Sequence, residues 1–315
     1  MKKHLLLITL LILGVTFFSC KRKYQIVPPP TPSSSIHDTI LKNREDSRSL
    51  YYIGGGAGGD FTTDAGIQFH IPYYSFRDLA DDTVLSTVTI EVIEILDPSD
   101  MILLNRPTTS SNAVLVTGGQ FKVSFSVNGN PVFIGDSTIF ARVPTADPDL
   151  NMIMFEGTED NTTFVDWTPV TDGFGANVPT PVSVDTINGA LFYYYDIVID
   201  STISNWINCD YFYNFNSPKT DITLTLPELH DNSNTFMFVH FDGIQSVMAG
   251  YFDGDNFVTP ATIPIGSLVT IVIISEIDDN YYSKFIPITV GSGYSATITP
   301  DPTTYADMIN SIVNL

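Results

Sequence analysis

The stretch FKVSFSVNGNPVFI, residues 121–134, indicates the fold class more clearly than the rest of the chain. Apolar residues occupy every second position from Phe121 to Val127, so their side chains fall on one face of a β-strand. Asn128-Gly129 then supplies residues that readily adopt positive φ, and a second apolar run follows. The stretch therefore predicts an antiparallel hairpin.

Similar patterns recur along the chain. TVTIEV (87–92) and DITLTLP (221–227) alternate in the same way. LVTIVIISEI (268–277) has apolar residues at both odd and even positions, as in a strand covered on both faces. Turn sequences rich in Asp, Asn, Gly and Pro separate these runs at spacings typical of a sandwich. No alternation of strands with helices is found. We therefore expect an all-β fold of two sandwich-like domains in tandem.

The last residues, DPTTYADMINSIVNL (301–315), predict a helix. Thr304 and Asp307 have the spacing of a capping box. Apolar residues then recur at helical spacing from Tyr305 to Val313. We expect a short amphipathic helix packed on the second domain.

The Gly- and Pro-rich stretch DGFGANVPTPVSVD (172–185) suggests where the two domains meet. Strand patterns flank it on both sides. We therefore predict a first domain at 50–175 and a second domain at 189–315.

The N-terminus has the features of a secretion signal. Lys2 and Lys3 precede an apolar run from Leu5 to Phe18, which is shorter than a membrane-spanning helix needs. Ser19-Cys20 ends the run and resembles the lipobox of bacterial lipoproteins, with bulky residues before Ser-Cys as in Bacteroidetes-type members. The alternative is an ordinary secretory peptide with an incidental Cys. The resemblance implies a signal peptide at 1–19, a diacylglyceryl group with acyl chains such as palmitate on Cys20, and a membrane anchor.

The sequence KRKYQIVPPPTPSSS after the signal peptide predicts a flexible tether over 20–49. Its first residues are basic, whereas surface-exported lipoproteins of the Bacteroidetes often carry acidic residues there. We therefore expect an anchor in the outer membrane that faces the periplasm.

Charge is distributed unevenly. Residues 1–50 hold eight of the 14 Lys and Arg and three of the 35 Asp and Glu, so residues 51–315 carry a net charge of −26. Such an acidic body repels nucleic acid and anionic membrane. At 43% hydrophobic and 12% aromatic residues, the chain is nevertheless apolar enough to fold. Only Cys20 and Cys209 are present, so a lipidated Cys20 leaves no intramolecular disulfide.

The first half resembles a known type of interaction domain. In GGGAGGDFTTDAGIQFHIPYYSF (54–76), a Gly-Gly turn leads into a strand and then to the Gly66-Ile67 and Ile71-Pro72 positions. This order resembles the start of the ZU-five domain of ankyrins and netrin receptors, although Tyr73 to Ser75 replace the family's turn. The WINCDYFYN segment (206–214) is similar to one found downstream of this domain in Bacteroidetes lipoproteins. The resemblance implies a β-sandwich interaction module without catalytic chemistry.

No pattern predicts catalysis, and we expect a protein that is not an enzyme. His70 and His240 alternate with apolar residues and are interpreted as strand residues. Cys209 lies beside Asp210, which raises a thiol pKa, and is interpreted as a buried structural Cys. Glu91 and Glu94 lie three apart in a strand and so point to opposite faces.

The glycines of YYIGGGAGGDF (51–61) match the dinucleotide fingerprint G-x-G-x-x-G through Gly54, Gly56 and Gly59. Such a site requires a helix directly after the glycines. A strand pattern ending in proline follows instead. We interpret the glycines as the entry to the first sandwich.

Two weaker hypotheses concern ligands. Asp147, Asp149 and Asn151, and likewise Asp253, Asp255 and Asn256, place oxygen ligands in loops as calcium sites do, although capped turns explain the same residues. Trp167, Trp206, Tyr281 and Tyr282 could form an exposed aromatic surface for glycans, although core positions are the alternative.

The function that we expect is that of a non-catalytic structural or protein-interaction module on the cell envelope. The alternative is a glycan-binding accessory lipoprotein, and a calcium-binding adhesin-like module or a hydrolase is less favoured.

Overall fold

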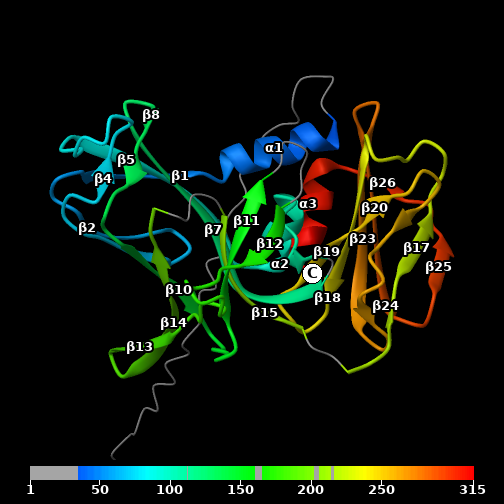
Figure 1. Cartoon of the computed structure of the whole chain (residues 1–315). Helices are drawn as coiled ribbons and strands as arrows, with labels where there is room; N and C mark the ends of the chain where they lie inside the picture. Colours follow the sequence, from blue (N-terminus) through cyan, green and yellow to red (C-terminus); the bar gives the residue numbers. More distant parts are fainter. Residues whose placement is uncertain (1–34, 112, 160–164, 202–205, 214–215) are drawn as a thin grey trace, which may run out of the picture.

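The computed structural model describes residues 35–111, 113–159, 165–201, 206–213 and 216–315. Within these residues the chain forms two β-sandwiches that lie on either side of a layer of helices (Figure 1). The expected all-β fold with a short C-terminal helix is confirmed.

The strands of the first sandwich are, in chain order, β1 (Ser49–Gly54), β2 (Gly59–Thr62), β3 (Gln68–Ile71), β4 (Phe76–Arg77), β5 (Thr87–Ile95), β6 (Thr109–Ser110), β7 (Ala113–Val127), β8 (Asn130–Pro131), β9 (Phe133–Ile134), β10 (Ile139–Thr145), β11 (Ile153–Glu159), β12 (Val165–Pro169), β13 (Val182–Ile187), β14 (Ala190–Ile199) and β15 (Trp206–Phe212). The first inner sheet, in the order β1-β5-β7-β15-β11-β12, faces the helices. The first outer sheet has the order β13-β14-β10-β3-β2.

Alternating side chains of these two sheets form the first core. Phe69 and Tyr195 of the outer sheet and Phe121 of the inner sheet are each at most 2% exposed. The hairpin of β7 and β8 turns at Asn128 and Gly129, whose φ values of 50° and 81° are both positive, as the sequence predicts.

The predicted domain boundary at 172–188 is wrong. Strand β14 pairs with both β13 and β10, and β15 pairs with both β7 and β11. The first sandwich therefore extends to Phe212. The Gly- and Pro-rich stretch lies within this sandwich, because the strands on either side of it, β12 and β13, form hairpins with β11 and β14, and both hairpins join sheets that contain strands from earlier in the chain.

The second sandwich consists of β16 (Lys219–Thr220), β17 (Ile222–Thr225), β18 (Thr235–Phe241), β19 (Val247–Ala249), β20 (Tyr251–Phe252), β21 (Phe257–Val258), β22 (Ile263–Pro264), β23 (Leu268–Ile277), β24 (Asn280–Thr289), β25 (Tyr294–Thr297) and β26 (Asp301–Thr303). Its inner sheet has the order β19-β18-β23-β24-β26, and its outer sheet has the order β20-β21-β17-β25, in which β17 and β25 run parallel. Strand β23 is buried on both faces, as expected: Ile271 points into the second core, and Val272 toward the helices.

The helix layer consists of α1 (Ile36–Asp46), α2 (Pro98–Leu103) and α3 (Tyr305–Val313). Met308 and Ile312 of α3 pack in one cluster with Trp206 of the first sandwich and Phe238 of the second. The C-terminal helix therefore contacts the second sandwich, as predicted, and also helps to join it to the first. At its start, the Thr304 side chain accepts a hydrogen bond from the Asp307 amide.

The expectation of a flexible tether over 20–49 is wrong for its second half, which contains helix α1. Residues 20–34 lie outside the described residues, but the chain is helical from Ile36 and enters β1 at Ser49. The Ser35 side chain caps the helix by accepting from the Asp38 amide, and the Asp38 carboxylate accepts from the Ser35 amide at 3.0 Å. Ile36 and Ile40 are buried, so apolar packing adds to this local stabilisation.

Contacts along α1 reach both sandwiches. His37 Nε2 lies 3.0 Å from the Asn232 carbonyl oxygen, and the Thr39 hydroxyl donates to Glu276 at 3.1 Å, both in the second sandwich. At the other end, Arg44 Nε donates to the Leu104 carbonyl at 2.7 Å, just after α2. No helix in the described part of the chain combines the length and apolar character needed to cross a membrane.

Candidate functional site

The glycine-rich turn between β1 and β2 lies against neighbouring backbone. A Cβ on Gly55 would stand 2.6 Å from the Val84 carbonyl oxygen, and a Cβ on Gly58 would overlap the Ile71 carbonyl oxygen. Gly58 also has a φ of +60°. The turn leads directly into strand β2, in agreement with the expectation that no helix follows the glycines.

This turn lies near β4, at the end of the first sandwich distant from the helices (Figure 1), and the segments around it carry exposed apolar side chains. A Cβ on Gly56 would lie 3.1 Å from Leu85 Cδ2 and 3.5 Å from Tyr74 Cε1, so both side chains lie over the turn. β4 and β9 pair beside them. We call the group the tip patch, and its members with their exposed fractions are Tyr73 (73%), Tyr74 (56%), Leu79 (77%), Leu85 (67%) and Phe133 (49%).

Backbone geometry fixes part of the tip patch. Tyr74 has a φ of 57°, a conformation that costs free energy in a residue other than glycine. Its carbonyl accepts a hydrogen bond from Arg77 Nη1 at 3.0 Å. The surrounding structure thus holds an aromatic side chain outward in a strained backbone conformation, which is a feature of functional sites.

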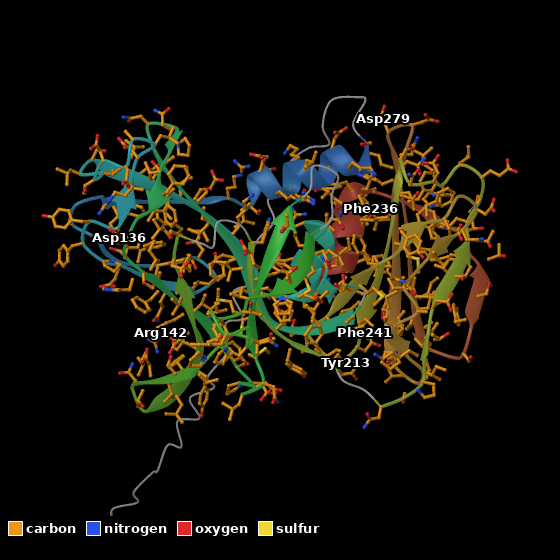
Figure 2. All side chains as sticks on the ribbon, viewed as in Figure 1. Asp136, Arg142, Tyr213, Phe236, Phe241 and Asp279 are labelled. Atoms are coloured by element: carbon orange, nitrogen blue, oxygen red, sulfur yellow. The ribbon has the colours of Figure 1, made fainter. Side chains whose placement is uncertain are left out.

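Acidic residues border the tip patch. Asp78 Oδ1 accepts from the amides of Ala80 and Asp82 at 2.9 and 3.0 Å and so orders the loop that carries Leu79. Asp136, labelled in Figure 2, follows Gly135, whose amide donates to the Ser75 carbonyl. The patch therefore has an apolar centre and a negatively charged rim.

A second surface is the solvent face of the first outer sheet. Arg142, labelled in Figure 2, lies on β10, the central strand of this sheet, and alternation along β10 places it on the same solvent face as the exposed Phe140. Its Nη1 and Nη2 atoms donate to the two oxygens of Asp185 at 2.8 and 3.0 Å, and Nη1 also donates to Gln68 at 3.1 Å. The guanidinium lies 4.3 Å from the ring centroid of Tyr194. The hydrogen bond from Arg142 lowers the pKa of Asp185.

Most of the aromatic residues considered for glycan binding are buried. Trp167 and Trp206 are at most 1% exposed, because the face of the inner sheet that carries them is covered by the helix layer. Trp167 Nε1 donates to the Pro107 carbonyl at 2.9 Å. Tyr281 is buried in the same cluster, and Tyr282 contacts His230 edge-on. Three of the four rings thus occupy core positions, which is the alternative that the sequence left open, and Tyr282 is half-buried, so the four rings do not form one exposed platform.

The expected calcium loops are capped turns. Asp149 Oδ1 accepts from both the amide and the side chain of Asn151, at 2.8 and 2.7 Å. Asp253 Oδ1 accepts from the amides of Asp255 and Asn256. These bonds lower the pKa of Asp253. Among the described residues, no group of three or more Asp, Glu, His or Cys side chains is placed to hold a metal ion. Calcium binding in these loops stays a prediction.

The WINCD segment is a buried strand with a polar ladder. Asn208 Nδ2 donates to Asp210 Oδ2 at 2.6 Å, and the Thr117 hydroxyl donates to Asn208 Oδ1 at 2.7 Å. Burial raises the pKa of Asp210 well above its ordinary range. Cys209 is fully buried, and burial likewise raises its thiol pKa, as expected for a structural Cys. The guanidinium carbon of Arg106 lies over the Trp206 ring, 4.8 Å from the ring centroid.

The remaining candidates lie apart. His70 is exposed, with Nδ1 2.6 Å from Asp60, whereas His240 is mostly buried and has a lowered pKa because of burial. Glu94 is buried and accepts from Thr63, whereas Glu91 lies on the opposite face of β5 and pairs with Arg48. As predicted, the two carboxylates do not share a face.

Cys20 lies outside the described residues. Sequence reasoning missed both surfaces described above. The alternation of β10 and β14 could have indicated an outward row of mixed aromatic and charged residues, whereas no sequence signal marks the tip patch as exposed. Compared with models of protein families and with curated protein sequences, the chain matches none.

Proposed function

We propose that this chain is a non-catalytic, lipid-anchored protein of the cell envelope that binds a protein partner through the tip patch. The observation that carries the proposal is that neighbouring segments at one end of the first sandwich carry five large apolar side chains, each 49–77% exposed, of which Tyr74 and Leu85 lie over the same turn. Exposed apolar groups of this kind, bordered by charge, are typical of protein-binding surfaces.

The acidic rim supports a particular kind of partner. Asp78, Asp82 and Asp136 border the patch, and residues 51–315 carry a net charge of −26. A partner with an apolar centre and a basic rim complements this surface and is drawn to it by long-range attraction. A second copy of the chain would instead bring like charges together.

The position of α1 supports the anchoring role. A lipid on Cys20 would insert into the outer membrane. Only a short segment of chain separates Cys20 from α1, and α1 forms hydrogen bonds to both sandwiches. Such an anchor would hold the whole body near the membrane, with the tip patch on the side away from the helices. We place the protein on the periplasmic side.

Anchoring is tested by Cys20→Ser in the full chain. The variant is expected to leave the membrane fraction, whereas the unmodified chain remains there with a covalently attached acyl chain detectable by mass spectrometry. A variant that stays in the membrane fraction like the unmodified chain would contradict lipid anchoring.

Partner binding is tested with a photo-crosslinking residue in place of Leu85, in cells that make the protein. Leu268, which is 58% exposed in the second sandwich, is the matched control. A discrete adduct with one protein is expected at 85 and not at 268, and Leu79→Asp is expected to abolish it. Equal labelling at both positions, or none at 85, would contradict the proposal.

A further inference from the structure

Within the described part of the chain, the helices that cover the inner sheet of the first sandwich do not cover the solvent face of its outer sheet. The inner sheet buries its second face against the helix layer. On the outer sheet, Phe140 and Phe192 are 46% and 44% exposed, and Val198 is 45% exposed. This face therefore presents ordered side chains to solvent.

Polar groups at the centre of the face are held in place across β3, β10, β14 and β13. Arg142 bonds to Gln68 and Asp185, lies 3.5 Å from Asp196 and is also bonded to Ser183, whose hydroxyl donates to Asp196 at 2.7 Å. The side chains of Arg142, Asp185 and Asp196 remain 28–40% exposed. They form a fixed lattice of donors and acceptors whose outer edges remain open to a ligand.

Aromatic rings stand at both ends of this lattice. Phe140 is directly opposite Val198, and Arg142 is directly opposite Asp196. Phe192 lies six residues from Val198 on the same strand, which corresponds to about 20 Å at the rise of a β-strand. In the direction of β14, the ring of Phe140 on β10, the polar lattice and the ring of Phe192 on β14 therefore follow one another.

The charges on this face indicate which class of ligand it can bind. Asp185 and Asp196 already offset the charge of Arg142, and the remaining body is strongly acidic, so the face does not attract an anion. The exposed apolar groups are separated by the polar lattice and do not form the continuous centre that a protein interface needs. A neutral, elongated ligand with alternating apolar and hydroxyl-bearing surfaces fits both features.

We propose that this face binds a neutral polysaccharide chain along β14, with sugar rings stacked on Phe140 and Phe192 and hydroxyl groups bonded to the lattice around Arg142. The site differs from the residues that the sequence indicated, because Trp167, Trp206 and Tyr281 are buried and Tyr282 lies in the second sandwich. It is also independent of the tip patch, so it can exist whether or not the tip binds a protein.

The test measures retention of the detergent-solubilised full chain on immobilised xylan, galactomannan, starch and β-glucan, with polygalacturonate as the anionic comparison. Binding to at least one neutral polymer is expected, with little change between low and high salt. Phe140→Ala and Phe192→Ala should each weaken it about tenfold or more, as loss of a buried ring contact does. Tyr251→Ala, an exposed ring of the second sandwich, is the matched control and should bind as the unmodified chain does.

A second measurement covers the case in which a variant is poorly folded. Hydrogen exchange of the unmodified chain with and without the retained polysaccharide should show new protection in β10 and β14. Retention by polygalacturonate alone, an unchanged affinity of the Phe140→Ala/Phe192→Ala double variant, or self-association that this variant abolishes without any polysaccharide binding would each overturn the proposal.

Discussion

Asp210 is a single residue whose ionisation opposes folding. It is fully buried, and burial raises its pKa above the ordinary value of 3.8. Between pH 3.8 and that raised pKa, the folded state holds a proton that the unfolded state has released. This residue therefore makes the free energy of unfolding fall as the pH rises through that window.

Asp210→Asn is accordingly expected to stabilise the protein. The amide keeps an oxygen to accept from Asn208 and removes the ionisable group, so the free energy of unfolding at about pH 8 should rise by about 1–3 kcal/mol. The gain should vanish near pH 4. Urea unfolding across this range measures it, with the exposed Asp255→Asn as control. A variant less stable than the unmodified chain at both pH values would refute the assignment.

Gly58 is a residue at which no side chain fits. Its φ is +60°, and a Cβ would overlap the Ile71 carbonyl oxygen. We expect Gly58→Ala to cost about 3 kcal/mol or more, because backbone strain and overlap add. Gly129→Ala, with φ +81° and nothing within 4 Å of the added Cβ, should cost only about 1 kcal/mol. Equal losses in denaturant unfolding would show that the close approach to Ile71 has no effect.

The sequence predicts some residue positions and not others. Period-two alternation correctly places Phe121 in the core and Glu91 and Glu94 on opposite faces. It cannot tell that the helix layer covers the second face of β15, and so the sequence left open whether Trp206 lies in the core or at the surface. Exposure of a ring depends on distant chain segments, which local patterns do not record.

Helix α1 is the element that links the N-terminal segment to both sandwiches. Arg44 is buried and donates to the carbonyls of Leu104 and Asn105 just after α2. Arg44→Ala leaves these buried carbonyls without their donor and should lower the free energy of unfolding by about 1–3 kcal/mol. It should also increase hydrogen exchange throughout α1.

Lys42 supplies the matched control on the same helix. Its exposed pair with Asp46 is worth at most about 1 kcal/mol, so Lys42→Ala should leave exchange in α1 nearly unchanged. If Arg44→Ala behaved like Lys42→Ala, α1 would not depend on its contact with the segment after α2.

Elements were predicted best where the signal is local. The terminal helix follows from the spacing of Thr304, Asp307 and the apolar residues after them. Helix α1 carries a comparable signal in Ser35 and Asp38, but the proline- and serine-rich segment before it led to the prediction of a tether. The domain boundary was misplaced because the pairing of β14 with β10 and of β15 with β7 is non-local, whereas glycine and proline mark only the turn.

At the scale of the whole molecule, the helix layer makes one body of the two sandwiches. In its apolar cluster, Trp206 of the first sandwich, Phe238 of the second and Met308 of the terminal helix pack together. Backbone bonds also cross between the sandwiches, as from the Thr108 amide to the Val247 carbonyl at 2.8 Å. Neither sandwich can separate without exposing this cluster to water, so we expect them to unfold together.

Calorimetry of the full chain, together with hydrogen exchange read separately for each sandwich, tests this central claim most directly. We expect a single transition in which the van't Hoff and calorimetric enthalpies agree, with β7 and β23 losing protection at the same temperature. Two transitions, with one sandwich remaining protected after the other has unfolded, would contradict it.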